Sequence, residues 1–169
     1  MLAYNEFLIK KRGNTWIKKY KDTVFIGIDP GATTGVVTYI NQEVTNKSQL
    51  DTGKGEDYVK QVKSIFDYLN EYNPDIIVCE DYRIYEDKSD IHIGIKLYTV
   101  ELLGIIKAWA YLNDCKVIMQ PAIVIKRGFI SGKMENWGYP KYSGGHGKNH
   151  WHDALKHLFY ALLFNNEIK

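Results

Sequence analysis

The stretch VFIGIDPGATTG, residues 24–35, decides the fold of this chain. Its apolar run is typical of a buried central strand, and Asp29 stands where that strand ends. Pro30 cannot continue a central strand, while Gly31 and Gly35 let the backbone turn tightly and approach a ligand closely. A carboxylate held rigidly at a sheet edge suits a metal ligand, and we expect Asp29 to be one. The alternative is a strand followed by an ordinary turn that contains an aspartate.

The composition indicates one soluble globular domain with basic charge in two places. The chain has 169 residues, of which 45% are hydrophobic and 25% charged, and its net charge is only +2. Residues 1–22 hold six basic and two acidic residues, and residues 126–149 hold five basic and one acidic. Such clusters form the phosphate-binding surface of nucleic-acid proteins and also occur on solvated loops, so charge alone leaves both interpretations open.

Cysteine usage and hydropathy indicate a cytosolic protein. Cys79 and Cys115 lie in apolar runs without a CxxC motif, which predicts free, buried thiols in a reducing compartment. No apolar run reaches the length of a membrane span, and the basic N-terminus lacks the apolar core of a signal peptide. We therefore expect no membrane partner.

Periodicity predicts an alternation of strands and helices after the opening strand. Short apolar or alternating runs predict further strands over residues 35–40, 43–50, 75–79 and 116–120. Apolar residues at three- and four-residue steps predict helices over residues 59–69, 95–112 and 150–164, with a short helix over 121–127. The tight links make the first three strands antiparallel.

Three of these elements offer acid or imidazole groups. Asp29 follows the first strand and Glu80 follows the strand at 75–79. His150, Asp153 and His157 form a stripe along the edge of the apolar face of the last helix. A stripe in that position faces a cleft at the sheet edge.

This order of elements and motifs resembles the ribonuclease H-like superfamily, and within it the RuvC-type Holliday junction resolvases, particularly small bacteriophage versions. Asp29 in GIDPG matches the first acid of that family and Glu80 in IIVCED the second. The motif HxxDAL, with His150 and Asp153, matches the C-terminal pair. QPAIVIK at residues 120–126 looks like the strand-to-helix junction of the family, which makes Lys126 a phosphate contact.

The resemblance covers residues 24 to about 164 and implies an α/β, ribonuclease H-like fold. Its five-stranded mixed sheet has three antiparallel and then two parallel strands, flanked by helices. Residues 23–169 are then the nuclease domain and residues 1–22 a basic N-terminal extension without a family counterpart. That extension is a hairpin, an arm on DNA or a strap that binds a partner; the sequence does not decide among them.

The resemblance also implies an activity. The expected enzyme is a metal-dependent endonuclease, a crossover junction endodeoxyribonuclease, that resolves four-way DNA junctions by paired symmetric nicks and leaves a 5′ phosphate and a 3′ hydroxyl. Two Mg²⁺ or Mn²⁺ ions per site supply the chemistry. We expect Asp29 to bridge both ions, Glu80 and Asp153 to hold one each, and His150 to be a ligand or to orient the attacking water. The expected partners are branched DNA and a second copy of the chain, in the cytosol of a bacterium or a phage-infected cell.

Further residues are candidates for DNA contact. The candidates are cationic or aromatic side chains near the site: Lys126, Arg127, Lys133, Lys141, Lys148, Tyr82 and Tyr85. The tyrosines would stack on splayed bases, with packing under loops as the alternative. Asp81 would point away from Glu80 because neighbours in a strand face opposite sides. We interpret His152 and His157 as helix-surface residues.

Other functions stay open beside the resolvase. One is a nuclease of the same fold that acts on flaps, forks or RNA, and another is a catalytically inactive DNA-binding module. DPGATTG also resembles the phosphate loop of actin-like ATPases and sugar kinases, but 169 residues cannot hold their two lobes. A zinc site from His146, His150, His152 and a distant cysteine lacks a recognised ligand spacing.

Overall fold

The computed structural model describes residues 4–52, 58–82, 98–126, 130, 132–139 and 149–168. Its sheet has the strand order β3-β2-β1-β4-β5. The strands are β1 (Phe25–Asp29), β2 (Thr33–Ile40), β3 (Glu43–Asp51), β4 (Ile76–Asp81) and β5 (Lys116–Pro121). The first three pair antiparallel, and β4 and β5 add to β1 in parallel. The predicted mixed sheet is confirmed.

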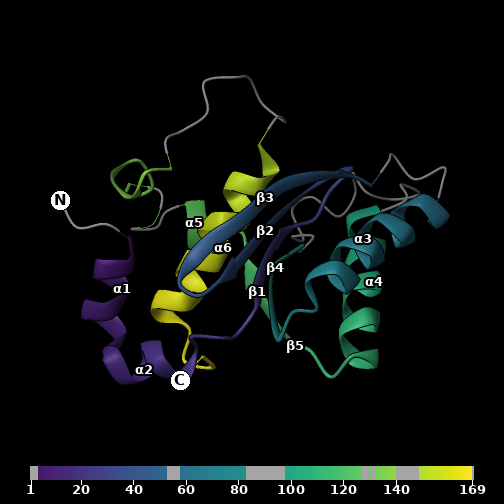
Figure 1. Cartoon of the computed structure of the whole chain (residues 1–169). Coiled ribbons are helices and arrows are strands. Elements are labelled where there is room, and N and C mark those ends of the chain that lie inside the picture. The colour runs from purple at the N-terminus through teal and green to yellow at the C-terminus, as the bar shows by residue number, and fades with distance from the viewer. Residues whose placement is uncertain are drawn as a thin grey trace.

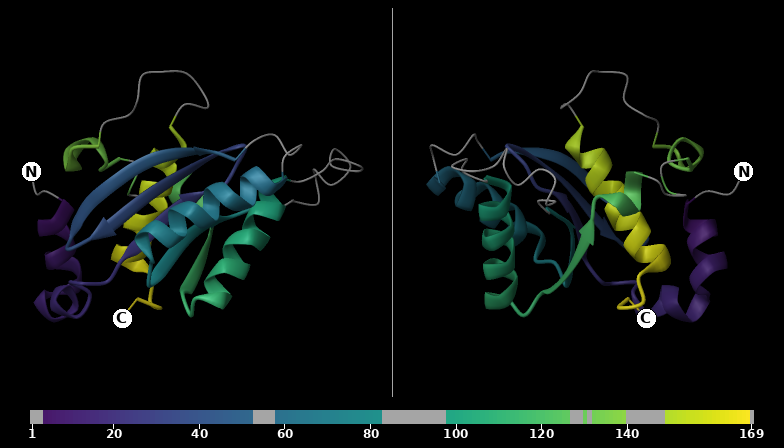
Figure 2. Two further views of the ribbon diagram at one scale, coloured as in Figure 1. Left: turned by 45° about the vertical axis from the view of Figure 1, so that its right-hand side comes forward. Right: turned by 180° about the vertical axis from the view of Figure 1, so that it is seen from behind.

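Helices cover both faces of this sheet (Figures 1 and 2). The helices are α1 (Tyr4–Arg12), α2 (Asn14–Lys19), α3 (Tyr58–Tyr72), α4 (Tyr98–Leu112), α5 (Ile123–Lys126), the 3₁₀ turn η2 (Glu135–Trp137) and α6 (His150–Phe164). α3 and α4 lie on one face, and α6 lies on the other beside α1 and α2. In the described part of the chain, no helix combines the length and the apolar character needed to cross a membrane.

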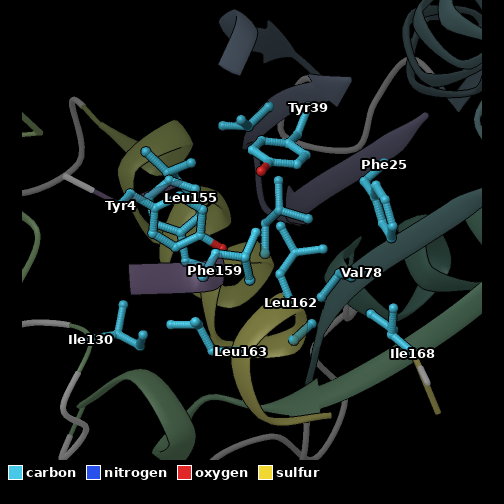
Figure 3. Packing of buried hydrophobic residues seen from close by; sticks show 14 of the residues in the cluster. Tyr4, Phe25, Tyr39, Val78, Ile130, Leu155, Phe159, Leu162, Leu163 and Ile168 are labelled. Carbon is cyan, nitrogen blue, oxygen red and sulfur yellow. The ribbon is translucent and has the colours of Figure 1, made fainter. Parts of the chain in front are cut away.

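The alternation of side chains along the strands creates two cores. Phe25 and Val78 belong to the core under α6, part of which is drawn in Figure 3. Ile26 and Ile77, one residue on, belong to the core under α3 and α4. Because side chains alternate with a period of two, Asp29 and Glu80 face α6 as Phe25 and Val78 do. Cys79 is a buried free thiol.

Two glycines bring α6 directly against the sheet. A Cβ on Gly27 would lie 2.6 Å from the carbonyl oxygen of Ala154, and one on Gly35 would lie 2.0 Å from the carbonyl carbon of His150. Any side chain at either position would push the helix away from β1 and β2. The close contact therefore depends on these two residues of the opening stretch.

The N-terminal segment forms two helices that pack against the C-terminal half of α6, not a hairpin. Tyr4 and Leu8 of α1 and Trp16 of α2 are buried in the core under α6. Figure 3 shows Tyr4 against Phe159 of α6, and the two rings are stacked with centroids 3.6 Å apart. These aromatic and apolar contacts build residues 4–20 into the fold.

Arg12 completes this attachment. Its guanidinium donates hydrogen bonds to the carbonyl oxygens of Leu162 at 2.7 Å, Ala161 at 3.3 Å and Asn165 at 2.8 Å. The last carbonyls of a helix have no partner within the helix, so Arg12 caps the C-terminus of α6. The indole of Trp16 donates a further hydrogen bond to the carbonyl of Ile168 at 3.0 Å.

Candidate active site

One residue from each strand contributes to a row that crosses the sheet beneath α6. Gln49 of β3 pairs with Gly35 of β2, which pairs with Asp29 of β1. Cys79 of β4 pairs with Ile28, so the next residue, Glu80, lies beside Asp29. Glu80 pairs in turn with Gln120 of β5. The fold therefore brings polar side chains from four separate stretches of sequence into one row, with Gly35 between Gln49 and Asp29.

Asp29 and His150 meet at the centre of this row. His150 Nδ1 lies 2.8 Å from Asp29 Oδ2, and the two side chains are 33% and 13% exposed. Burial raises the pKa of Asp29; the hydrogen bond from His150 opposes this shift, and the negative charges of Glu80 and Asp153 add to it. The hydrogen bond to Asp29 raises the pKa of His150, although burial opposes it. The charges of Glu80 and Asp153 therefore reach Asp29.

The first turn of α6 is positioned by the neighbouring strands. The backbone N–H of His150 donates to Oε1 of Gln49 at 2.9 Å, while Asn149, the residue before the helix, makes no side-chain cap among the described residues. Gly35 lies directly beneath the next peptide, which joins His150 to Trp151. β2 and β3 together therefore decide where His150 stands above Asp29.

The two other acids have protein partners as well. Asp153, 46% exposed, accepts a hydrogen bond from Lys156 Nζ at 2.5 Å. Glu80 Oε2 lies 2.9 Å from Nε2 of His157. Within the residues that the structure describes, no three His, Cys, Asp or Glu side chains are gathered closely enough to hold a metal ion.

The donor set nevertheless suits a hard divalent cation. Asp29, Glu80 and Asp153 supply carboxylate oxygens, the ligands that Mg²⁺ prefers, and the imidazole of His150 is also accepted by Mn²⁺. Burial raises the pKa of Asp29, and the negative charges of Glu80 and Asp153 raise it further; a bound cation would relieve that repulsion. The side chains fit such an ion in type, and at present each is held by a neighbour in the protein.

The predicted DNA contacts fall mostly outside the described residues. Arg127, Lys141, Lys148 and Tyr85 lie there, and for Lys126 only its backbone position at the end of α5 is described. Lys133 is half-buried in the turn before η2. Tyr82 packs against the core under α3 and α4.

Two histidines differ from the interpretation of the sequence. His157 is 0% exposed and His152 is 6% exposed, so their assignment to the helix surface is wrong. α6 is buried on more than one side because it packs between the sheet and α1. Gln120 and Gln49 were missed as well. The alternation in β5, where Ile118 faces α6, was the signal that could have placed Gln120 on the same face.

Comparison with known proteins finds relatives of the fold alone. No protein-family model and no curated protein matches the chain. Thermus thermophilus RuvC, solved in complex with Holliday junction substrate, is 21% identical and matches with a TM-score of 0.59 over 83% of this chain and 93% of that chain. The fowlpox virus Holliday junction resolvase is 17% identical, with a TM-score of 0.52 over 82% and 97%. The yeast mitochondrial Holliday junction resolvase Ydc2 is 13% identical, with a TM-score of 0.52 over 94% and 82%.

These matches and the sheet order confirm the predicted fold class. The chain has the ribonuclease H-like fold, in the form found in Holliday junction resolvases such as RuvC.

Proposed function

We propose that this chain, which has the fold of the Holliday junction resolvases, is a metal-dependent endonuclease that resolves four-way DNA junctions by paired symmetric nicks. The observation that carries the proposal is the pairing of Asp29 with His150 where β1 ends, within reach of the charges of two further acids. Asp29 lies 2.8 Å from His150, and the charges of Glu80 and Asp153 act on it. A site of three acids and one imidazole on this fold favours phosphodiester hydrolysis over an inactive binding module.

The chemistry of each side chain indicates its role in the proposed reaction. Mg²⁺ or Mn²⁺, two ions per site, would activate the attacking water and stabilise the charge on the attacking and leaving oxygens. Asp29, the central acid, would contact both ions, and Glu80 and Asp153 one each. Nδ1 of His150 lies 2.8 Å from Oδ2 of Asp29, and an ionised Asp29 can accept a hydrogen bond from it. His150 would serve as a ligand or orient the water, and the products would carry a 5′ phosphate and a 3′ hydroxyl.

DNA would approach the edge of the sheet where α5 follows β5. α5 packs against α6, so the end of α5 lies on the side of the sheet that holds the site. We assign phosphate contacts to Lys126, Arg127, Lys133, Lys141 and Lys148, and base stacking to Tyr82 and Tyr85. Residues 23–169 would carry the chemistry, and α1 and α2, at the opposite end of α6 from His150, would support that helix.

Paired nicks need two sites, so we propose a homodimer. α4 exposes three large apolar side chains, Val100, Tyr111 and Leu112, which is the kind of surface that a second copy covers. Replacing Tyr111 and Leu112 together by glutamate should yield a monomer in light scattering. Such a monomer would nick one strand and leave the opposing strand intact. We place this activity in the cytosol of a bacterium or a phage-infected cell.

A labelled synthetic four-way junction tests the function. We expect symmetric paired nicks with Mg²⁺ or Mn²⁺, none with EDTA, and slow or no cleavage of linear duplex and flap controls. Asp29→Asn should bind the junction and leave it uncut. Equal cleavage of all substrates would replace the proposal by a broader branched-DNA nuclease, and tight binding without cleavage by the wild type would favour the inactive module.

A further inference from the structure

His157 joins two residues of the row beneath α6. Its Nε2 lies 2.9 Å from Oε2 of Glu80, and its Nδ1 lies 3.0 Å from Oε1 of Gln120. The ring is 0% exposed and stands two turns after His150 on α6. Glu80 and Gln120 are paired neighbours on β4 and β5, so one imidazole spans both strands.

The hydrogen-bonding groups fix which atom donates to Glu80. With Oε1 of Gln120 and Oε2 of Glu80 facing the ring, both oxygens accept, and the ring must donate from both nitrogens. The Nε2 atom of Gln120 is buried and has no hydrogen-bond partner among the described residues. Turning that amide over gives it one, since its N–H then donates to Nδ1 of a neutral ring. In both arrangements Nε2 carries a proton, and an ionised Glu80 accepts it.

We propose that His157 is a positioning residue that holds the carboxylate of Glu80 in the active site, with Gln120 fixing the orientation of the ring. This inference rests on the proposed function, in which Glu80 holds a divalent cation. One oxygen of Glu80 is occupied by His157, which leaves the other oxygen for the cation. Glu80 is otherwise a flexible side chain, and a buried donor that cannot move removes rotamers that do not face Asp29.

The same helix offers a matched control. His152 is also buried, and its Nε2 lies 3.3 Å from the carbonyl oxygen of Tyr139, away from the row of polar residues. Replacing either histidine removes a buried imidazole from α6 and tests the stability of the core. Only a change at His157 alters what holds Glu80.

The choice of substitutes separates positioning from packing. The amide of glutamine reaches about as far as Nε2 of histidine, and the amide of asparagine only about as far as Nδ1. His157→Gln therefore keeps a donor for Glu80, whereas His157→Asn and His157→Phe do not. His152→Phe serves as the control for loss of a buried imidazole.

The main measurement is the affinity of the DNA-free protein for Mn²⁺, by calorimetry or electron paramagnetic resonance. Loss of a residue that orients a metal ligand weakens binding by about 10- to 100-fold, and we expect this for His157→Asn and His157→Phe. His157→Gln should recover most of the affinity, and His152→Phe should retain it whatever its melting temperature. Junction binding in EDTA should stay as in the wild type.

The outcomes distinguish the positioning role of His157 from the proposed nuclease function. Unchanged Mn²⁺ affinity in folded His157→Asn or His157→Phe would overturn the positioning role while leaving the nuclease in place. The same holds if His157→Gln loses as much affinity as His157→Asn at equal thermal stability. A wild type that neither binds Mn²⁺ nor nicks junctions would refute the proposed function itself. If His157→Phe does not fold, the Mn²⁺ affinities of His157→Gln and His157→Asn alone decide whether His157 positions Glu80.

Discussion

Replacing Gly35 by alanine should move the first turn of α6 off the sheet. A Cβ at this position would lie 2.0 Å from the carbonyl carbon of His150, 2.2 Å from its oxygen and 2.3 Å from the nitrogen of Trp151. Ordinary van der Waals contact begins at 3.4 Å, so the shortest contact must lengthen by about 1.4 Å. All three atoms belong to backbone, which cannot rotate out of the way as a side chain does.

That displacement falls on the centre of the site. His150 Nδ1 and Asp29 Oδ2 are 2.8 Å apart, and a shift of this size breaks their hydrogen bond. A misplacement of about 1 Å at a catalytic group costs on the order of 100-fold in rate. Overpacking of a well-filled core costs about 1–3 kcal/mol of folding free energy. We therefore expect Gly35→Ala to fold with a lower melting temperature and to nick junctions at least about 100-fold more slowly.

The assay is single-turnover nicking of a labelled four-way junction, with thermal unfolding measured on the same preparation. Gly104→Ala is the matched control. Apart from its chain neighbours and the backbone of α4 itself, no described atom lies within 4 Å of a Cβ at that position. Alanine in a helix interior is about 1 kcal/mol better than glycine. Wild-type nicking and melting temperature in Gly35→Ala would refute the idea that this glycine sets the position of His150.

Three further predictions concern other parts of the molecule. Arg12→Ala should cost about 1–3 kcal/mol in denaturant unfolding without slowing the folded enzyme, because it uncaps α6; an unchanged midpoint would contradict it. Lys156→Met should release Asp153 and tighten Mn²⁺ binding, and weaker binding in calorimetry would contradict this. In EDTA, the melting temperature of the wild type should exceed that of His150→Gln most at about pH 5.5 and least at about pH 8.5.

The sign of the pH effect follows from the raised pKa of His150. The pair with Asp29 stabilises the folded protein below the ordinary pKa of histidine, 6.5, and this contribution is lost as the pH rises through the raised pKa. At lower pH, protonation of Asp29, whose pKa is raised by burial, removes the charge that attracts the imidazolium, so the difference becomes smaller again. A difference in melting temperature that grew with pH would contradict the pairing.

Much of the fold was predictable because its signals are local. Short apolar runs such as that of β1, closed by Asp29 and Pro30, identify buried strands without knowledge of their neighbours. The differences at strand ends are small: β2 begins at Thr33 rather than at residue 35, since Thr33 and Thr34 still pair with β3. The stripe on α6 predicted that His150 would face the sheet edge, and its ring lies 2.8 Å from Asp29 at the end of β1.

The roles of His157 and Gln49 could not be predicted because they depend on distant parts of the chain. A histidine at the edge of an apolar stripe is exposed when the helix has one neighbour and buried when it has two. The ring of His157 lies against Glu80 of β4 and Gln120 of β5, and α6 also packs against α5 and α1. No local pattern around His157 predicts these contacts with distant parts of the chain. Gln49 lies on the edge strand β3, whose side chains alternate between half-buried and exposed. Its hydrogen bond to His150 forms only because α6 begins directly above this strand.

The bonds from Arg12 to α6 connect residues about 150 positions apart in the chain. During synthesis, α1 and α2 therefore leave the ribosome long before the helix that covers their apolar side chains exists. The same late helix brings His150 and Asp153 to Asp29. A nascent chain consequently has neither a complete core nor a complete candidate site until α6 has been made, so the same helix completes both the fold and the site for the proposed nuclease activity.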